Sequence, residues 1–137
     1  MFYIYKDAIN IIKILQDKEQ RFYSNYICLF NPLKIKSGTV LLEIGCQPNE
    51  VYFLVNGCIL IEPEHKQLQS HYFIEGAVFG EKDILQDKLS TETYKALCDC
   101  FLLYLSKESF FTLLFEFPDF RNDIMDIARA REKYRIE

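Results

Sequence analysis

The chain has 137 residues, half of them apolar, and a net charge of −4. This length and composition predict one domain with a sizeable core. Because acidic and basic residues are interspersed, we expect no nucleic-acid binding, which needs a clustered basic face. No apolar run is long enough to cross a bilayer, and Lys6, Asp7 and Lys13 interrupt the N-terminus. The sequence therefore predicts neither a membrane span nor a signal peptide.

The first region, residues 1–32, is predicted to be helical. Apolar residues recur at helical spacing between Asp7 and Leu15, and a second apolar stripe runs from Phe22 to Phe30. A break that contains three charged residues, at positions 18–21, lies between the two stripes. Pro32 ends the pattern, because the residue before a proline avoids the helical region.

The second region, residues 33–105, has the pattern of short β-strands joined by turns. "LKIKSGTVLLEIG" alternates and turns at Ser37 and Gly38. "EVYFLVNGCILIEP" holds two β-rich runs broken at Asn56 and Gly57, which is a hairpin signal. "HYFIEGAVFG" and "TYKALCDCFLLYLS" supply further strands. We therefore predict an α+β fold in which an antiparallel β-roll, a jelly-roll-like barrel, has flanking helices.

The third region, residues 106–137, is predicted to be helical again. Ser106 is a suitable N-cap, with Ser109 at the third helical position. Pro118 separates this helix from a final one. The apolar faces of the two helices contain Phe110, Leu113 and Leu114, and then Phe120, Ile124, Ile127 and Tyr134.

The five cysteines occur at irregular spacing. Cys98 and Cys100 form a CxC pair, but no second Cys or His pair stands at metal-ligand spacing. Because a structural zinc site needs four ligands, we expect no metal site. The sequence predicts reduced and mostly buried thiols in a cytosolic protein.

The string "FGEKDIL", which begins at Phe79, carries the most specific local signal. A glycine followed by a short helix presents backbone N–H groups and the positive end of the helix dipole, where an anion can bind. Glu81 could accept a hydrogen bond from a sugar hydroxyl beside that anion. The local string by itself favours the alternative, a turn and a short surface helix capped by Glu81.

The order of the motifs along the chain resembles the cyclic nucleotide-binding domain family. The strings "SGTVLLEIG", "EVYFLVNGCI", "EGAVFGE" and "KALCDCFLLYLSKESFFTLLFEFP" follow the family's order of glycine turns, hairpin, phosphate cassette and alanine-led strand into a helix. The cassette falls on residues 74–96, and the resemblance extends from about Ile11 to Arg135. Within the family, "FGEKDIL" and "FPDFRNDIMDIARAREKYR" look closest to the C-terminal domains of voltage-gated and hyperpolarisation-activated cation channels.

The resemblance implies a set of site residues. Phe79, Gly80 and Glu81 match the start of the cassette, with N–H groups after Gly80 toward the cyclic phosphate and Glu81 toward the ribose 2′-hydroxyl. The short helix of the cassette, Glu81 to Leu85, is expected to lie inside the roll. Thr91 falls where a threonine often contacts the phosphate or purine. Arg131 falls where some channels use an arginine to cap the base.

The chain departs from the family at the phosphate clamp. The cassette arginine falls on Ser90, and the small residue two positions later falls on Glu92. Lys88 offers a point charge but no planar fork. We therefore expect cAMP or cGMP to be a weak or absent ligand and not a required cofactor. An alternative occupant is the chain's own C-terminal run, with Tyr134 or Ile136 reaching back.

The resemblance implies a non-catalytic regulatory domain of a potassium-type cation channel, on the cytoplasmic side of a membrane and excised from a homotetrameric parent. The isolated chain is then expected to be a monomer or weak dimer. Two alternatives remain open, a cyclic-nucleotide-binding regulatory subunit of a protein kinase and a plain protein-interaction module. We expect no enzymatic activity, because the sequence contains no paired nucleophile and base and no GxxxxGK loop.

Overall fold

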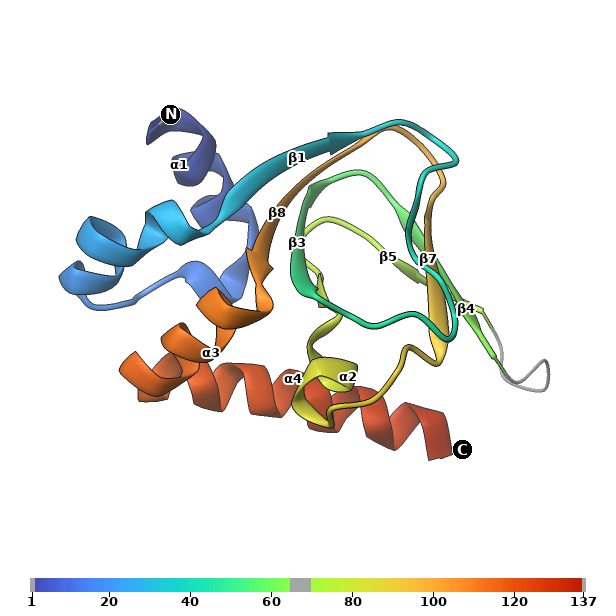
Figure 1. The fold of residues 1–137 in the computed structure, drawn as a ribbon. Helices are drawn as coiled ribbons and strands as arrows, with labels where there is room; N and C mark the ends of the chain where they lie inside the picture. Colours follow the sequence, from blue (N-terminus) through green and yellow to red (C-terminus); the bar gives the residue numbers. More distant parts are fainter. Residues whose placement is uncertain (1, 65–69, 137) are drawn as a thin grey trace.

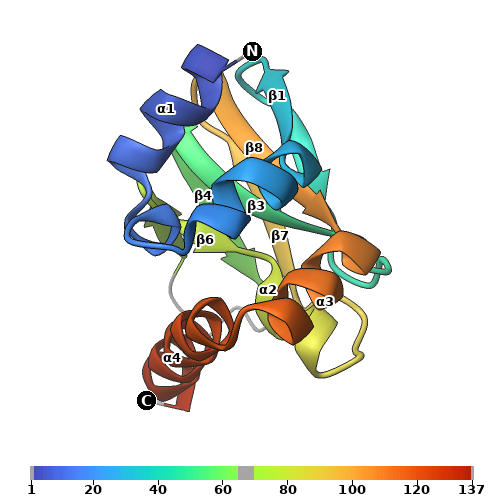
Figure 2. The ribbon, with the colours of Figure 1, turned by 90° about the vertical axis from the view of Figure 1, so that its left-hand side faces the viewer.

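The computed structural model describes the backbone of residues 2–64 and 70–136 and the side chains of residues 5–64 and 70–130. Within these ranges, two antiparallel four-stranded sheets form a roll, and helices cover one side and one end of it (Figures 1 and 2). The predicted α+β fold, an antiparallel β-roll with flanking helices, is confirmed. In the described part of the chain, no helix is both long and apolar enough to cross a membrane.

The first sheet has the strand order β1-β8-β3-β6 and the second has the order β2-β7-β4-β5. Figure 1 shows the two sheets facing each other across the roll. The strands are β1 (Asn31–Ile35), β2 (Val40–Leu42), β3 (Glu50–Asn56), β4 (Ile59–Pro63), β5 (His71–Phe73), β6 (Val78–Phe79), β7 (Glu92–Ala96) and β8 (Cys100–Ser106).

The chain passes from one sheet to the other at Gly57, so the hairpin predicted there is wrong. β3 pairs with β8 and β6, whereas β4 pairs with β7 and β5. Gly57 has a φ of +122°, and a Cβ at this position would collide with the Cys100 thiol of β8. The glycine is needed for this close crossing between sheets. Local turn signals do not show which sheet the next strand joins.

β3 is buried on both of its faces. Val51, Phe53 and Val55 pack in the cluster that includes the helices, whereas Tyr52 and Leu54 pack in the cluster inside the roll. Alternate residues of a strand point to opposite faces, so this one strand belongs to two cores. Its two-sided burial connects the helices mechanically to the interior of the roll.

The N-terminal region contains one regular helix, α1 (Phe2–Ile11), followed by short turns. These are the 3-10 turns η1 (Lys13–Leu15) and η3 (Ile27–Leu29) and the π-helical turn η2 (Phe22–Tyr26). The helix predicted from Asp7 therefore ends earlier than expected, because Ile12 and Gln16 have extended backbones and Asp17 has a φ of +57°. The apolar spacing still identifies the core, since Ile12, Leu15 and Phe22 are fully buried.

Three further helices lie at one end and one side of the roll. α3 (Lys107–Glu116) begins as predicted, with Ser106 Oγ accepting a hydrogen bond from Ser109 N at 3.1 Å. α4 (Pro118–Ile136) begins at the proline that was expected to separate the helices. α2 (Glu81–Leu85) has the predicted bounds, but it contacts β3 and α4 at the end of the roll instead of lying inside it (Figure 1).

All five thiols are free. Only Cys100 is buried, so the expectation of mostly buried thiols is wrong: Cys28, Cys46 and Cys98 lie at exposed positions. The described residues contain no group of three or more His, Cys, Asp or Glu side chains that could hold a metal ion.

Candidate functional site

The candidate anion cradle begins at Gly80, the residue that caps the N-terminus of α2. Gly80 has a left-handed backbone, with φ 90° and ψ −8°. A Cβ at this position would lie 3.0 Å from the Glu50 carbonyl oxygen of β3. Both observations require glycine here. The N–H groups in the first turn of a helix have no acceptor within it, so this turn has the backbone geometry of an anion site.

Replacing Gly80 with Ala should destabilise the fold by about 1–3 kcal/mol, because the left-handed backbone is strained for alanine and the new methyl group presses on β3. Chemical denaturation measures this difference. Gly38→Ala is the matched control, since Gly38 has a similar φ of +89° but a Cβ there would have no neighbouring atom within 4 Å. An equal loss of stability in both variants would show that contact with β3 contributes nothing at Gly80.

An aromatic cluster fills the roll beside this cradle. The ring of Phe79 is fully buried and stacks on Tyr52 and Phe73, with centroid distances of 5.3 and 5.1 Å. The ring of Tyr94 meets it edge-on at 5.1 Å. Phe79, predicted as a cassette residue, therefore also holds the core of the roll. Its partners were not predicted from the sequence, although the period-two alternation of β3 and β7 could have placed Tyr52 and Tyr94 on inward faces.

The N-terminal end of α2 carries two buried carboxylates. Glu81 and Asp83 both belong to its first turn and both are buried. Each takes part in an interaction within the fold. Acidic side chains in the first turn complement the positive end of the helix dipole. The attraction of α2 for an external anion is therefore partly offset by its own side chains, and Asp83 was not foreseen as part of this site.

Ser90 occupies the position of the cassette arginine, and its polar groups are used within the fold. The residue is only 2% exposed. Its N–H donates to Cys46 O at 2.9 Å, and its carbonyl accepts from Gly45 N at 2.7 Å. Its hydroxyl donates to Glu92 O at 2.6 Å and accepts from Glu92 N at 3.3 Å. Ser90 thus closes a turn and supplies no positive charge.

The side chain of Glu92 is directed toward the interior of the roll. Its Oε1 lies 3.5 Å from the hydroxyl of Tyr94, the residue two positions along β7 that packs in the roll cluster. Residues two apart on a strand share a face. A second carboxylate, Glu50, lies 3.4 Å from the Tyr52 hydroxyl. Burial and then the Glu50 charge raise the pKa of Tyr52, so the Tyr52 hydroxyl stays neutral beside the aromatic cluster.

Thr91 and Lys88 were also predicted near the phosphate, and each contributes a backbone group to a hydrogen bond. Thr91 is half-buried, and its carbonyl accepts a hydrogen bond from Glu64 N at 2.9 Å. Lys88 is exposed, and its N–H donates to Asp83 O at 2.9 Å. The side chains of Arg131, Tyr134 and Ile136 lie outside the described residues, although the helical backbone of α4 extends through these positions.

Three solved structures have a closely similar fold. The structure of PKAR CBD2 with bound Sp-2Cl-cAMPS superposes with a TM-score of 0.80 at 20% identity, over 96% of this chain and 87% of that one. The catabolite activator protein of Thermus thermophilus gives 0.75 at 17% identity, over 88% and 58%. The regulatory subunit of a cAMP-independent protein kinase A from Trypanosoma brucei gives 0.78 at 13% identity, over 96% and 45%.

The present chain thus spans about half the length of the last two proteins. No curated protein sequence matches it. The model of the cyclic nucleotide-binding domain matches residues 32–117, which is more than half of the chain and includes the roll, the cassette and α3. By this match, and by a fold shared with these structures, the chain belongs to the cyclic nucleotide-binding domain family.

Proposed function

We propose that this chain is a regulatory domain that binds cyclic nucleotide weakly or not at all and passes a conformational signal between its roll and its helices. The observation that carries the proposal is Ser90, whose hydroxyl is bonded to the backbone of Glu92 at the position where the family places an arginine. Losing one partner of a buried charge pair costs about 2–5 kcal/mol. The inward carboxylate of Glu92 adds repulsion to a bound phosphate.

The signalling part of the proposal rests on how the cores are connected. β3 and β8 each contribute residues to the cluster inside the roll and to the cluster that includes the helices. A rearrangement of side chains in one cluster therefore alters the packing of the other. In this proposal the domain has two conformations that differ in how the helices pack on the roll. A ligand, or a side chain that takes its place, shifts the equilibrium between them only by its differential affinity for the two conformations.

The internal occupant in this proposal is the C-terminal end of α4, with Tyr134 or Ile136 as the side chain that reaches the cradle. Its support is the course of the helix: α4 runs beneath the end of the roll, contacts α2 and continues beyond it (Figure 1). The same fold occurs in the regulatory subunit of a cAMP-independent protein kinase A from Trypanosoma brucei. A regulatory role without cyclic nucleotide is compatible with that example.

Two parent proteins are proposed. The resemblance of the cassette and of the last helix favours a potassium-type cation channel, with this domain on the cytoplasmic side of the membrane in a homotetramer. The structural neighbours favour a protein kinase regulatory subunit, because two of the three structures compared above are from protein kinase A regulators. The full-length gene decides between them: upstream membrane spans indicate the channel, and a pseudosubstrate segment indicates the kinase regulator.

Calorimetric titration of the purified domain with cAMP and with cGMP tests the proposal. We expect binding to be weak or undetectable with both nucleotides.

A further inference from the structure

The junction between α3 and α4 is a single residue, Phe117. Its backbone is extended, with φ −129° and ψ 94°, and its side chain is buried. The ring of Phe117 meets Phe22 edge-on at 5.2 Å and Tyr26 edge-on at 5.0 Å. Any change in the angle between the two helices must turn about this residue, and its ring is held by the N-terminal segment.

Arg21 binds the last residue of α3 and covers the junction. Its Nη1 lies 3.0 Å from Glu116 Oε2, and its Nη2 donates to the Glu116 carbonyl at 3.1 Å. The guanidinium carbon is 4.5 Å from the centroid of the Phe117 ring, which is a cation–π contact. One planar group therefore contacts the end of α3 and the hinge residue together, a geometry that lysine cannot reproduce.

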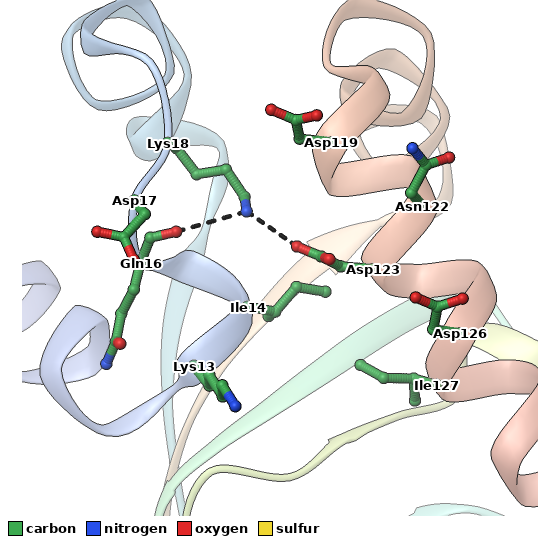
Figure 3. A pocket seen from close by; sticks show the side chains of 10 residues that line it. All are labelled: Lys13, Ile14, Gln16, Asp17, Lys18, Asp119, Asn122, Asp123, Asp126 and Ile127. Carbon is green, nitrogen blue, oxygen red and sulfur yellow. Dashed lines mark hydrogen bonds and ion pairs between the residues drawn. The ribbon is translucent and has the colours of Figure 1, made fainter.

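Lys18 holds α4 on the far side of the same junction. Its Nζ lies 3.0 Å from Asp123 Oδ2 and 3.4 Å from the Gln16 carbonyl. Figure 3 shows the ammonium between these two groups, at a cavity of about 590 Å³ bounded by the N-terminal segment and α4. The Lys18 side chain is only 7% exposed, so losing Asp123 would leave a nearly buried charge without its counter-ion.

The segment that carries Lys18 and Arg21 is itself braced. The Tyr23 hydroxyl donates to the Leu15 carbonyl at 2.7 Å and accepts from Lys18 N at 3.0 Å. These bonds close the turn between η1 and η2. The two cations therefore extend from one hydrogen-bonded segment. They contact two helices that are connected by a single residue.

We propose that Lys18 and Arg21 form a two-point clamp that fixes the angle between α3 and α4. Arg21 fixes the end of α3 and Lys18 fixes α4, so the N-terminal segment and α4 move together or both contacts break. The inference rests on the proposed function, because it names the residues through which a signal passes between the N-terminal segment and α4. The clamp needs neither nucleotide nor a second chain.

Backbone hydrogen exchange of the nucleotide-free domain tests the clamp, in Arg21→Ala, Lys18→Met and Glu116→Gln variants. Arg21→Ala and Lys18→Met remove the clamp contacts of a whole side chain, whereas Glu116→Gln removes only the charge that faces Arg21 and leaves the N-terminal segment unchanged. We expect exchange at residues 116–124 to rise about tenfold in Arg21→Ala and Lys18→Met and about threefold in Glu116→Gln, while the amides of β3 and β8 keep their native rates. Arg129→Ala is the matched control, because its ion pair with Asp126 lies within α4 and bridges no two elements.

Unchanged exchange at residues 116–124 in Arg21→Ala and Glu116→Gln would overturn the clamp, as would an equal rise in β3 and β8, which indicates general loss of stability. If Lys18→Met does not fold, Asp123→Asn tests the same contact from α4. Tight nucleotide binding by the native chain would contradict the proposed function but leave these exchange rates unaffected, so the two failures are distinguishable.

Discussion

The double substitution Ser90→Arg with Glu92→Ala should raise the affinity for cAMP or cGMP by at least about tenfold, which corresponds to 1.4 kcal/mol. Arginine restores a planar cation for the phosphate, and alanine removes a carboxylate that faces the roll. If the full cost of the missing charge pair were recovered, the gain would be about 30-fold to several-thousand-fold. Calorimetric titration of the native and substituted domains measures the difference.

The matched control for charge is Ser90→Gln with Glu92→Ala, which adds a long polar side chain without a cation. Glu92→Ala alone separates the removal of repulsion from the gain of a partner. Because Ser90 is buried and bonded to the turn at Gly45 and Cys46, circular dichroism should first show that each variant is folded. Equal affinities of the arginine and glutamine variants would show that a missing cation does not limit binding.

Phe79→Ala should destabilise the domain by about 3–5 kcal/mol, the usual cost of removing a buried phenylalanine ring. The ring is fully buried, and it contacts Tyr52, Phe73 and Tyr94. Its loss leaves a cavity among the three rings that pack around it. Urea denaturation measures the free energy of unfolding of the variant and the native chain.

Phe115→Ala on α3 is the control for the same chemical change without burial, because that side chain is 84% exposed. We expect its effect to stay within about 0.5 kcal/mol. A loss below about 1 kcal/mol in Phe79→Ala would mean that the aromatic cluster does not hold the roll together.

The order of the helices and strands was predictable because local sequence patterns determine it. The glycine turns, the two-residue alternation of the strands and the cap at Ser106 all act over a few residues. The bounds of α2 and the start of α4 at Pro118 follow from the same kind of signal. Pairing was not predictable in this way, since the chain crosses between sheets at Gly57, and the close contact that requires glycine there is with Cys100 on the distant strand β8.

The sequence predicts which residue types belong to the candidate site, but not the contacts that their side chains make. The resemblance to the family places the cradle at Gly80 and the missing cation at Ser90, and both assignments stay predictions. It gave no sign that the Ser90 hydroxyl is bonded to Glu92, or that Glu50 and Glu92 lie beside the hydroxyls of two clustered tyrosines. Likewise, Arg21 and Glu116 are 95 positions apart, and no periodicity connects them. Contacts of this kind depend on how distant elements pack.

The most direct test of the central claim is calorimetric titration of the unmodified domain with cAMP and cGMP. The account predicts weak or undetectable binding of both, with dissociation constants above about 10 μM or, equivalently, binding free energies weaker than about 7 kcal/mol. Submicromolar binding of either nucleotide by the native chain would contradict it. That result would mean that Lys88 or Arg131 supplies the charge that Ser90 lacks.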